Sequence, residues 1–352
     1  MVRFSDIIKT KGKKDEGKKS SDAARHEDGF RLSDSRLFKA RDVDSPVNKE
    51  PGVRRAGSIE TVNYYRAFVE RTRETGQAVK NDMNISPASI LSDLHSIIEK
   101  GLIDGLYEYA VSVKNHSYDI ALHTVAVAFT SLKLGRAMKY DIKMMMRLGL
   151  AAFLENTGMY KIPENIITAT GKLSAEERAL IRKHPETGRD ILSNLGERYL
   201  WLADAALSTH ERYDGSGYPA GLRGDEIPEI SAVIGLVDTY IAMINIRPYR
   251  DKIIQTEAIK YITGEGRGRF SPGIVKVFLD QVSMFPVNSH VKLNNGSIAK
   301  VLATDRRHPL SPVVEIICDG EGHETDRGQL INIADNPLLY IKRAINPDDP
   351  AD

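Results

Sequence analysis

The sequence predicts a mainly α-helical protein that ends in a small β-rich module. Apolar residues recur at helical spacing through most of residues 58–282, and several of these segments begin with capping residues. Beyond Pro286 the apolar period changes to two, which is typical of β-strands. A helical bundle followed by a short antiparallel sheet is therefore the expected fold.

The composition is typical of a globular protein without disulfide bonds or membrane-spanning segments. The chain has 352 residues with 41% apolar content, enough for a full core and more than one domain. A formal net charge of +1 gives no reason to expect nucleic-acid binding, and the single Cys318 excludes an internal disulfide framework. No segment approaches the roughly 20 apolar residues of a membrane helix, so we expect no membrane span and a cytoplasmic location.

Residues 1–57 mix lysines with Ser, Asp and Glu and show no regular apolar period. This composition predicts a disordered, charged N-terminal tail. The lysine cluster would also suit an anionic lipid or nucleic acid, but Asp15 and Glu16 dilute its charge, so we favour a solvated linker.

Two leading helices are predicted within residues 58–101. The first shows apolar residues at helical spacing from Ile59 to Val69. The second is expected to open at Ser86-Pro87, with Ser86 as N-cap and proline at the first helical position, and to run to Lys100.

Residues 102–285 predict the main helical domain. Ser174 and Glu177 have the spacing of a capping box, and Ser271-Pro272 marks the start of the last helix. The segment Gly264–Gly268 resembles a dinucleotide-binding loop, but it follows a predicted helix instead of a strand, which argues against a nucleotide fold.

Residues 286–345 predict the β-rich module. His290–Leu293 reads as a strand, Asn295-Gly296 as a hairpin turn, and Val313–Ile317 as a later strand rich in β-branched residues.

Polar residues interrupt successive apolar helices of the main domain. They are Asp119 and His123 on one helix face, Glu155-Asn156, His184, His210 and Asp238. Each one alone would more often be a hydrogen-bonded core residue than a ligand. Burying so many polar groups is costly unless they converge on one another, on water or on an ion, so together they indicate a site. The glycine-rich stretch Thr209–Pro219 predicts a rigid loop beside His210.

Over roughly residues 85–345 the chain resembles the HD-GYP family, the bacterial phosphodiesterase-related branch of the HD superfamily associated with cyclic di-GMP. The motifs that carry the resemblance are the His123 helix, Tyr160–Ile167, Lys172–Glu177, His184-Pro185, His210–Leu222, Asp238, Arg247–Arg250 and Phe270–Pro272. The resemblance implies a compact HD-superfamily helical bundle with a di- or trinuclear metal centre. It also implies that the segment from Pro286 is the β-extension often found after this domain.

The sequence departs from the family at several functional positions. The name-giving His-Asp pair falls on Glu155-Asn156, and a neutral amide is a poor bridge between two metals. Met159 replaces the usual lysine, Thr209 replaces the first residue of a His-His pair, and Ile241 replaces a carboxylate. We therefore expect at most one firmly bound divalent transition metal, iron or manganese.

The resemblance assigns two sets of site residues. The metal ligands would be His123, Glu155, His184, His210 and Asp238, and Asp119 stands where some family members carry a further carboxylate. The ligand-binding residues would be Tyr218, Pro219, Arg247 and Arg250. Arg250 is as readily explained by a structural salt bridge.

We interpret the chain as a degenerate HD-GYP protein in cyclic di-GMP signalling. In this interpretation it binds cyclic di-GMP or a related cyclic dinucleotide, regulates an unidentified signalling protein and hydrolyses little or nothing. The alternatives are an active metal-dependent cyclic di-GMP phosphodiesterase with an altered metal site, and an interaction scaffold with a vestigial pocket.

Overall fold

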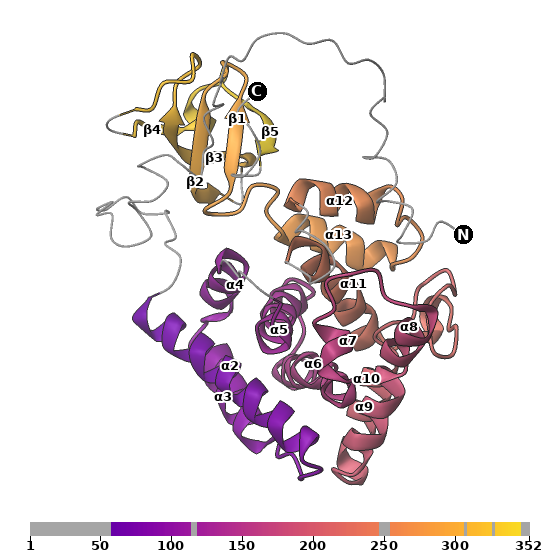
Figure 1. Cartoon of the computed structure of the whole chain (residues 1–352). Coiled ribbons are helices and arrows are strands. Elements are labelled where there is room, and N and C mark those ends of the chain that lie inside the picture. Colours follow the sequence, from indigo (N-terminus) through magenta and orange to yellow (C-terminus); the bar gives the residue numbers. More distant parts are fainter. Residues whose placement is uncertain (1–57, 114–117, 246–253, 306–307, 326–327, 346–352) are drawn as a thin grey trace, which may run out of the picture.

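The computed structural model describes residues 58–113, 118–245, 254–305, 308–325 and 328–345 (Figure 1). The predicted tail, residues 1–57, lies outside these ranges, as do Arg247 and Arg250. Within them, helices form one large core and a five-stranded sheet follows at the C-terminal end. The mainly helical fold with a C-terminal β-rich module is thus confirmed.

The two leading helices are α2 (Ile59–Lys80) and α3 (Ala88–Glu99). Ser58 caps α2 by accepting the Thr61 backbone N–H through its hydroxyl. The expected side-chain cap at Ser86 is wrong: α3 begins one residue later, with Pro87 as its first flanking residue and no side-chain cap. Phe68 of α2 stacks on Phe153, so these helices share the core of the main domain.

Helix α5 (Ile120–Ala137) lies in the middle of the bundle and is buried over most of its surface (Figure 1). It follows α4 (Ile103–Ser112) and precedes α6 (Ile142–Leu154). Asp119 caps α5 through Oδ1, which accepts two backbone N–H groups, while its Oδ2 accepts from Arg73. Both carboxylate oxygens of Asp119 therefore have structural roles.

The second half of the bundle carries most of the site. It comprises α7 (Glu164–Ile167), α8 (Ala175–Arg182), α9 (His184–Ser193), α10 (Leu200–Leu207) and α11 (Glu229–Ile244), with short 3-10 turns at Thr157–Lys161, Glu197–Tyr199 and Gly224–Glu226. The predicted capping box of Ser174 and Glu177 is present. His184 is the first residue of α9, because α8 ends at Arg182 and Lys183 forms the turn between the two helices.

Two further helices, α12 (Gln255–Thr263) and α13 (Pro272–Gln281), pack beside α11. Gly264–Gly268 connects α12 to α13 and follows a helix, so the dinucleotide loop is rightly rejected. Pro272 occupies the first turn of α13 as predicted, although the Ser271 side chain does not cap it.

The C-terminal sheet is antiparallel, with strand order β4-β3-β2-β1-β5. Its strands are β1 (His290–Leu293), β2 (Ile298–Asp305), β3 (His308–Cys318), β4 (Leu330–Asn332) and β5 (Ile341–Ile345), and a 3-10 turn spans Ile333–Asp335. The Asn295-Gly296 hairpin is confirmed: Gly296 has φ +90°, and Val291 pairs with Ala299 across the turn. The sheet has its own small core around Val291, Val301 and Val314.

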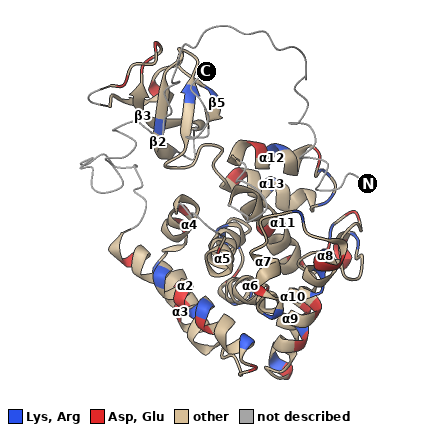
Figure 2. Cartoon of the chain, in the orientation of Figure 1, with Lys and Arg blue, Asp and Glu red and all other residues tan. Residues whose placement is uncertain are grey.

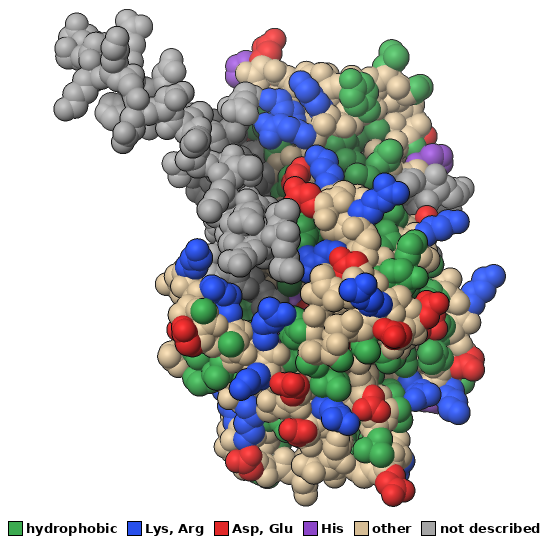
Figure 3. All heavy atoms as spheres, turned by 90° about the vertical axis from the view of Figure 1, so that its right-hand side faces the viewer, with side chains coloured by type: hydrophobic (Ala, Val, Ile, Leu, Met, Phe, Trp, Pro, Cys, Tyr) green, Lys and Arg blue, Asp and Glu red, His purple; other side chains and the backbone are tan. Residues whose placement is uncertain are grey.

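Charged side chains are spread over the outer helices, and both signs occur on α2, α8 and α9 (Figure 2). The face in Figure 3 likewise intersperses basic and acidic groups. This mixture is what the formal net charge of +1 predicts. None of the helices in the described ranges is both long and apolar enough to cross a lipid bilayer.

Candidate functional site

Four of the five predicted metal ligands meet in a connected chain of contacts. His123 Nε2 of α5 lies 2.8 Å from Asp238 Oδ1 of α11, and the other oxygen, Oδ2, lies 4.0 Å from His210 Nδ1. His210 Nε2 in turn lies 2.9 Å from His184 Nε2 at the start of α9. The structure thus brings together residues that are up to 115 positions apart in the sequence.

Two close backbone contacts place these elements. A Cβ atom at Gly235 of α11 would lie 2.3 Å from the Thr209 carbonyl oxygen, so only glycine lets this helix pack against the residue before His210. A Cβ atom at Gly158 would lie 1.9 Å from the His184 carbonyl oxygen. The first contact sets Asp238 beside His210, and the second sets the turn after Glu155-Asn156 against α9.

His210 is held as a neutral imidazole. Burial lowers the pKa of His210 well below its usual range, and the neighbouring His184 lowers it further, while Asp238 opposes the shift. His184 Nδ1 lies 2.6 Å from the Ile181 carbonyl oxygen, so Nδ1 carries a proton that it donates to this oxygen, and the other ring nitrogen, Nε2, faces His210. Neutral imidazole is the form that binds metal ions.

The loop after His210 is fixed by two buried charged residues. The Glu211 carboxylate accepts backbone N–H groups from Ala220, Gly221 and Leu222 at 2.6–3.1 Å. The Arg212 guanidinium donates to the backbone carbonyls of Thr209 and Glu211 and to the Thr239 hydroxyl. These two side chains link the loop to itself and to α11, and such hydrogen bonds favour the rigid loop that the sequence predicts.

Tyr218 forms one wall of the site. Its ring stacks on the His210 imidazole with centroids 5.0 Å apart and the planes within 1° of parallel. The Arg182 guanidinium also lies on the Tyr218 ring, with its central carbon 4.5 Å from the ring centroid. Burial raises the pKa of Tyr218 to about 12, so its hydroxyl stays protonated at neutral pH. Pro219 follows Tyr218 through a cis peptide bond.

Glu155 and Asn156 stand buried at the end of α6. Glu155 is fully buried, and Asn156 donates to its carboxylate oxygen Oε1 at 2.5 Å. The Glu155 charge also acts to raise the Tyr218 pKa, so the two side chains are near enough to interact. The pair is therefore an integral part of the interior.

The other substituted positions are also packed. Met159 and Ile241 are buried apolar residues at 8% and 0% exposure. Thr209 is buried, and its hydroxyl donates to the Ala206 carbonyl oxygen. None of these three side chains offers a charged group to the site.

The donor set fits one transition metal ion by its chemistry. Two imidazole nitrogens bound to the same ion at about 2.1 Å lie roughly 3 Å apart, and His184 Nε2 and His210 Nε2 are 2.9 Å apart. The backbone carbonyl that orients His184 is the support usually found behind a metal-binding histidine. Nitrogen donors with carboxylate oxygens suit iron, manganese or zinc.

A second cluster of potential metal ligands lies in the C-terminal module. Within the described residues, Asp319, Glu321 and His323 bring one potential ligand atom each within 4.8 Å of one another, on the turn after β3. Glu321 and His323 are exposed, and the Asp319 carboxylate accepts the backbone N–H groups of both. The sequence reasoning missed this group, although its spacing of two residues is visible in the sequence.

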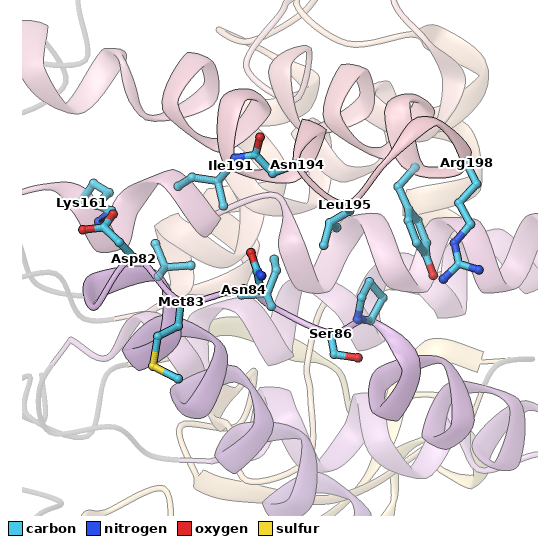
Figure 4. Close-up of a pocket in the computed structure, with 13 residues that line it drawn as sticks. Asp82, Met83, Asn84, Ser86, Lys161, Ile191, Asn194, Leu195 and Arg198 are labelled. Carbon is cyan, nitrogen blue, oxygen red and sulfur yellow. Dashed lines mark hydrogen bonds and ion pairs between the residues drawn. The ribbon is translucent and has the colours of Figure 1, made fainter.

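A separate surface cleft is lined by residues other than the site histidines (Figure 4). It has a volume of about 380 Å³ and lies between the α2–α3 connection, including Met83 and Asn84, and the end of α9, including Asn194 and Leu195. Lys161 and Asp82 form an ion pair of 2.5 Å at one end. None of the predicted site residues lines this cleft.

Two residues of the site were not singled out in the sequence. Glu211 lies inside the predicted loop Thr209–Pro219, but nothing in the sequence indicates that its carboxylate accepts three backbone N–H groups. Arg182 precedes His184 by two residues, and its contact with Tyr218 depends on the folded position of a loop 36 residues away. Arg247 and Arg250, which were predicted, lie outside the described residues.

Comparisons with known proteins agree with this fold. Residues 108–274 match the HD domain family, and residues 290–352 match a KOW domain associated with the HD domain. A solved HDG"Y"P protein of Bdellovibrio bacteriovorus superimposes with a TM-score of 0.51 at 17% identity, covering 62% of this chain and 70% of that one. This structural similarity supports the fold alone.

Curated relatives include cyclic di-GMP phosphodiesterases. One from Pseudomonas aeruginosa is 32% identical over 195 residues, which cover 55% of this chain and 47% of the relative. The cyclic di-GMP phosphodiesterase PdeB of Borreliella burgdorferi is 28% identical over 231 residues, 65% of this chain and 60% of that protein. The alignments thus span about half of each relative. The helical part of this chain is an HD domain of the HD-GYP kind, and an HD-associated KOW domain follows it.

Proposed function

We propose that this protein binds a cyclic dinucleotide, cyclic di-GMP first among them, as a regulatory module that hydrolyses it slowly or not at all. The relatives named above act on cyclic di-GMP, and a further relative from Vibrio cholerae is a 3'3'-cGAMP-specific phosphodiesterase. A ligand with two phosphodiester groups is therefore the expected class.

One observation carries the regulatory part of the proposal. Where the family has its His-Asp pair, this chain has Glu155 and Asn156, and the Asn156 amide is hydrogen-bonded to the Glu155 carboxylate. An amide oxygen is a weak, neutral donor to a metal, so Asn156 cannot replace a bridging carboxylate. The loop at 209–222 remains intact, so recognition is supported where catalysis is not.

If a metal is bound, His184 Nε2, His210, His123 and Asp238 would hold it, with Glu155 as a further carboxylate. A bound divalent cation supplies positive charge that polarises a phosphodiester and acidifies water. Burial keeps the His210 imidazole neutral and the Tyr218 hydroxyl protonated, so this hydroxyl can donate a hydrogen bond. We expect no more than one firmly bound ion in this site.

The test combines calorimetry and chromatography. The full chain is titrated with cyclic di-GMP, then incubated with it and with manganese or iron under reducing conditions, and the linear dinucleotide and GMP are measured. We expect binding with negligible product, and a His210→Ala variant whose product level is equally low. If product accumulates over many turnovers and His210→Ala abolishes it, the protein is an active phosphodiesterase with an altered site. If calorimetry detects no binding, the scaffold alternative holds.

The phosphodiesterase alternative has one specific observation in its favour. The His184 and His210 nitrogens already have the separation of two ligands on one ion, and His184 is oriented by the Ile181 carbonyl. Elemental analysis after dialysis tests the regulatory view, which expects at most one ion in the histidine site; two or more ions per chain there would contradict it and favour the phosphodiesterase. A His323→Ala variant serves as the control, because it removes the exposed group at Asp319–His323 without touching the histidine site.

A further inference from the structure

Arg182 is the last residue of α8 and lies next to the Tyr218 ring of the histidine site. Its guanidinium lies on the Tyr218 ring, and that ring lies in turn on the His210 imidazole. The three groups form a stack that leads from the exposed surface, where Arg182 lies, to the His184–His210 contact. The Arg182 cation therefore lies two residues before the candidate ligand His184, and one ring, that of Tyr218, separates it from the candidate ligand His210.

The contact with Tyr218 uses only the face of the guanidinium. A cation–π contact is made through the flat face, whereas the five N–H donors lie in the plane of the group and point outward. Among the residues that the structure describes, Arg182 has no ion-pair or hydrogen-bond partner for these donors. The stack therefore orients the group and leaves its donors to solvent or to a ligand.

Arg212 shows the opposite arrangement in the same loop. It is buried, and its donors go to the Thr209 and Glu211 carbonyls and the Thr239 hydroxyl. Arg212 is thus a structural residue with little capacity for a ligand. Of these two arginines, only Arg182 combines exposure, a fixed orientation and uncommitted donors.

We propose that Arg182, backed by the Tyr218 ring, binds a phosphate group of the dinucleotide that enters the histidine site. Planar guanidinium groups bind phosphate oxygens through two parallel hydrogen bonds, and a rigid stack reduces the side-chain entropy lost when they form. Both phosphates of a cyclic dinucleotide are anionic, so one can contact Arg182 while the other faces the histidines. This inference rests on the proposed function and adds a specific contact to it.

The experiment measures cyclic di-GMP binding to four forms of the full chain by calorimetry. They are the natural protein, Arg182→Gln, Arg182→Lys and Lys183→Gln. Lys183 is the matched control, since it is the next residue, is exposed and carries the same charge. We expect Arg182→Gln to raise Kd by about 10- to 100-fold, Arg182→Lys to raise it less, and Lys183→Gln to change it by about twofold at most.

Two further readouts separate a phosphate contact from a structural effect. Arg182 is exposed, so its variants should keep the thermal midpoint of the natural protein. Excess inorganic phosphate should compete with cyclic di-GMP for the natural protein more than for Arg182→Gln. An unchanged Kd in Arg182→Gln, or equal competition by phosphate in both forms, overturns the inference and leaves the proposed function standing.

If the natural protein does not bind cyclic di-GMP, the proposed function fails and a second measurement decides the role of Arg182. Phenylglyoxal modifies exposed arginines, and mass spectrometry locates the modified residue. Protection of Arg182 by excess inorganic phosphate, with Arg198 modified as before, supports an anion site at the stack. Modification of Arg182 at the same rate with and without phosphate overturns it.

Discussion

The loop at 209–222 and the pair Glu155-Asn156 lie in the same site but are stabilised in different ways. The loop is closed by Glu211, whose carboxylate accepts three backbone N–H groups, and by Arg212, which links it to α11. The pair is buried, and a side-chain hydrogen bond joins Asn156 to Glu155. The hydrogen bonds that hold the loop therefore come from Glu211 and Arg212 and do not involve the pair Glu155-Asn156.

The largest effect is expected when the Glu211 carboxylate, which holds the loop, is removed. Glu211→Ala leaves three backbone donors of residues 220–222 without their acceptor, so we expect a loss of about 3 kcal/mol or more in the free energy of unfolding. Urea denaturation measures it. Glu226→Ala is the control, because its exposed carboxylate accepts one backbone N–H, from Arg223, and should cost about 1 kcal/mol or less. Equal losses in the two variants would contradict the central role of Glu211.

A second test restores the family pair. Glu155→His combined with Asn156→Asp supplies a carboxylate able to bridge two ions, so we expect a second bound metal and a rise in cyclic di-GMP turnover on the order of 100-fold. Metal analysis and product chromatography measure the two effects. Glu155→His alone is the control, since it lacks the bridge. If the double variant stays at one metal and unchanged turnover, the remaining changes at Met159, Thr209 and Ile241 are already sufficient to prevent catalysis.

A third test concerns the contact that brings α11 to the loop. Gly235→Ala places a methyl group against the Thr209 carbonyl, so we expect a destabilisation of about 1–3 kcal/mol and a shift of Asp238 away from His210. Thermal unfolding measures the first effect. Gly171→Ala is the control, because a Cβ atom there has no neighbour within 4 Å and should change stability by about 0.5 kcal/mol at most. A Gly235→Ala protein as stable as the control would show that the two backbones separate easily.

The smallest effect is expected outside both regions, at the ion pair between Arg73 and Asp119. Arg73 is half exposed, so Arg73→Gln should cost about 1 kcal/mol or less, and the loss should shrink at high salt. Asp119→Ala also removes the cap of α5, so it should cost about 0.5–2 kcal/mol, and that loss should persist in salt. Chemical denaturation at two salt concentrations measures both. A larger loss for Arg73→Gln than for Asp119→Ala would reverse this ranking.

Features that depend on neighbouring residues were predictable from the sequence. The capping box at Ser174, the start of α2 after Ser58 and the Asn295-Gly296 hairpin are confirmed, since each is fixed by local hydrogen bonds or by the freedom of glycine. The error at Ser86 concerns a single residue at a helix end, where local preferences are nearly balanced.

The sequence also identified the candidate site residues, because buried polar groups in apolar helices are costly and stand out. It could not determine which of their atoms meet. The 2.9 Å contact between His184 and His210 requires α9 and the loop after α10 to pack together, and the approach of Asp238 to His210 requires the close packing at Gly235. The stack of Arg182 on Tyr218 likewise joins a helix end to a distant loop. Such contacts are decided only in the tertiary structure, because their free energy comes from packing between segments that no local pattern relates.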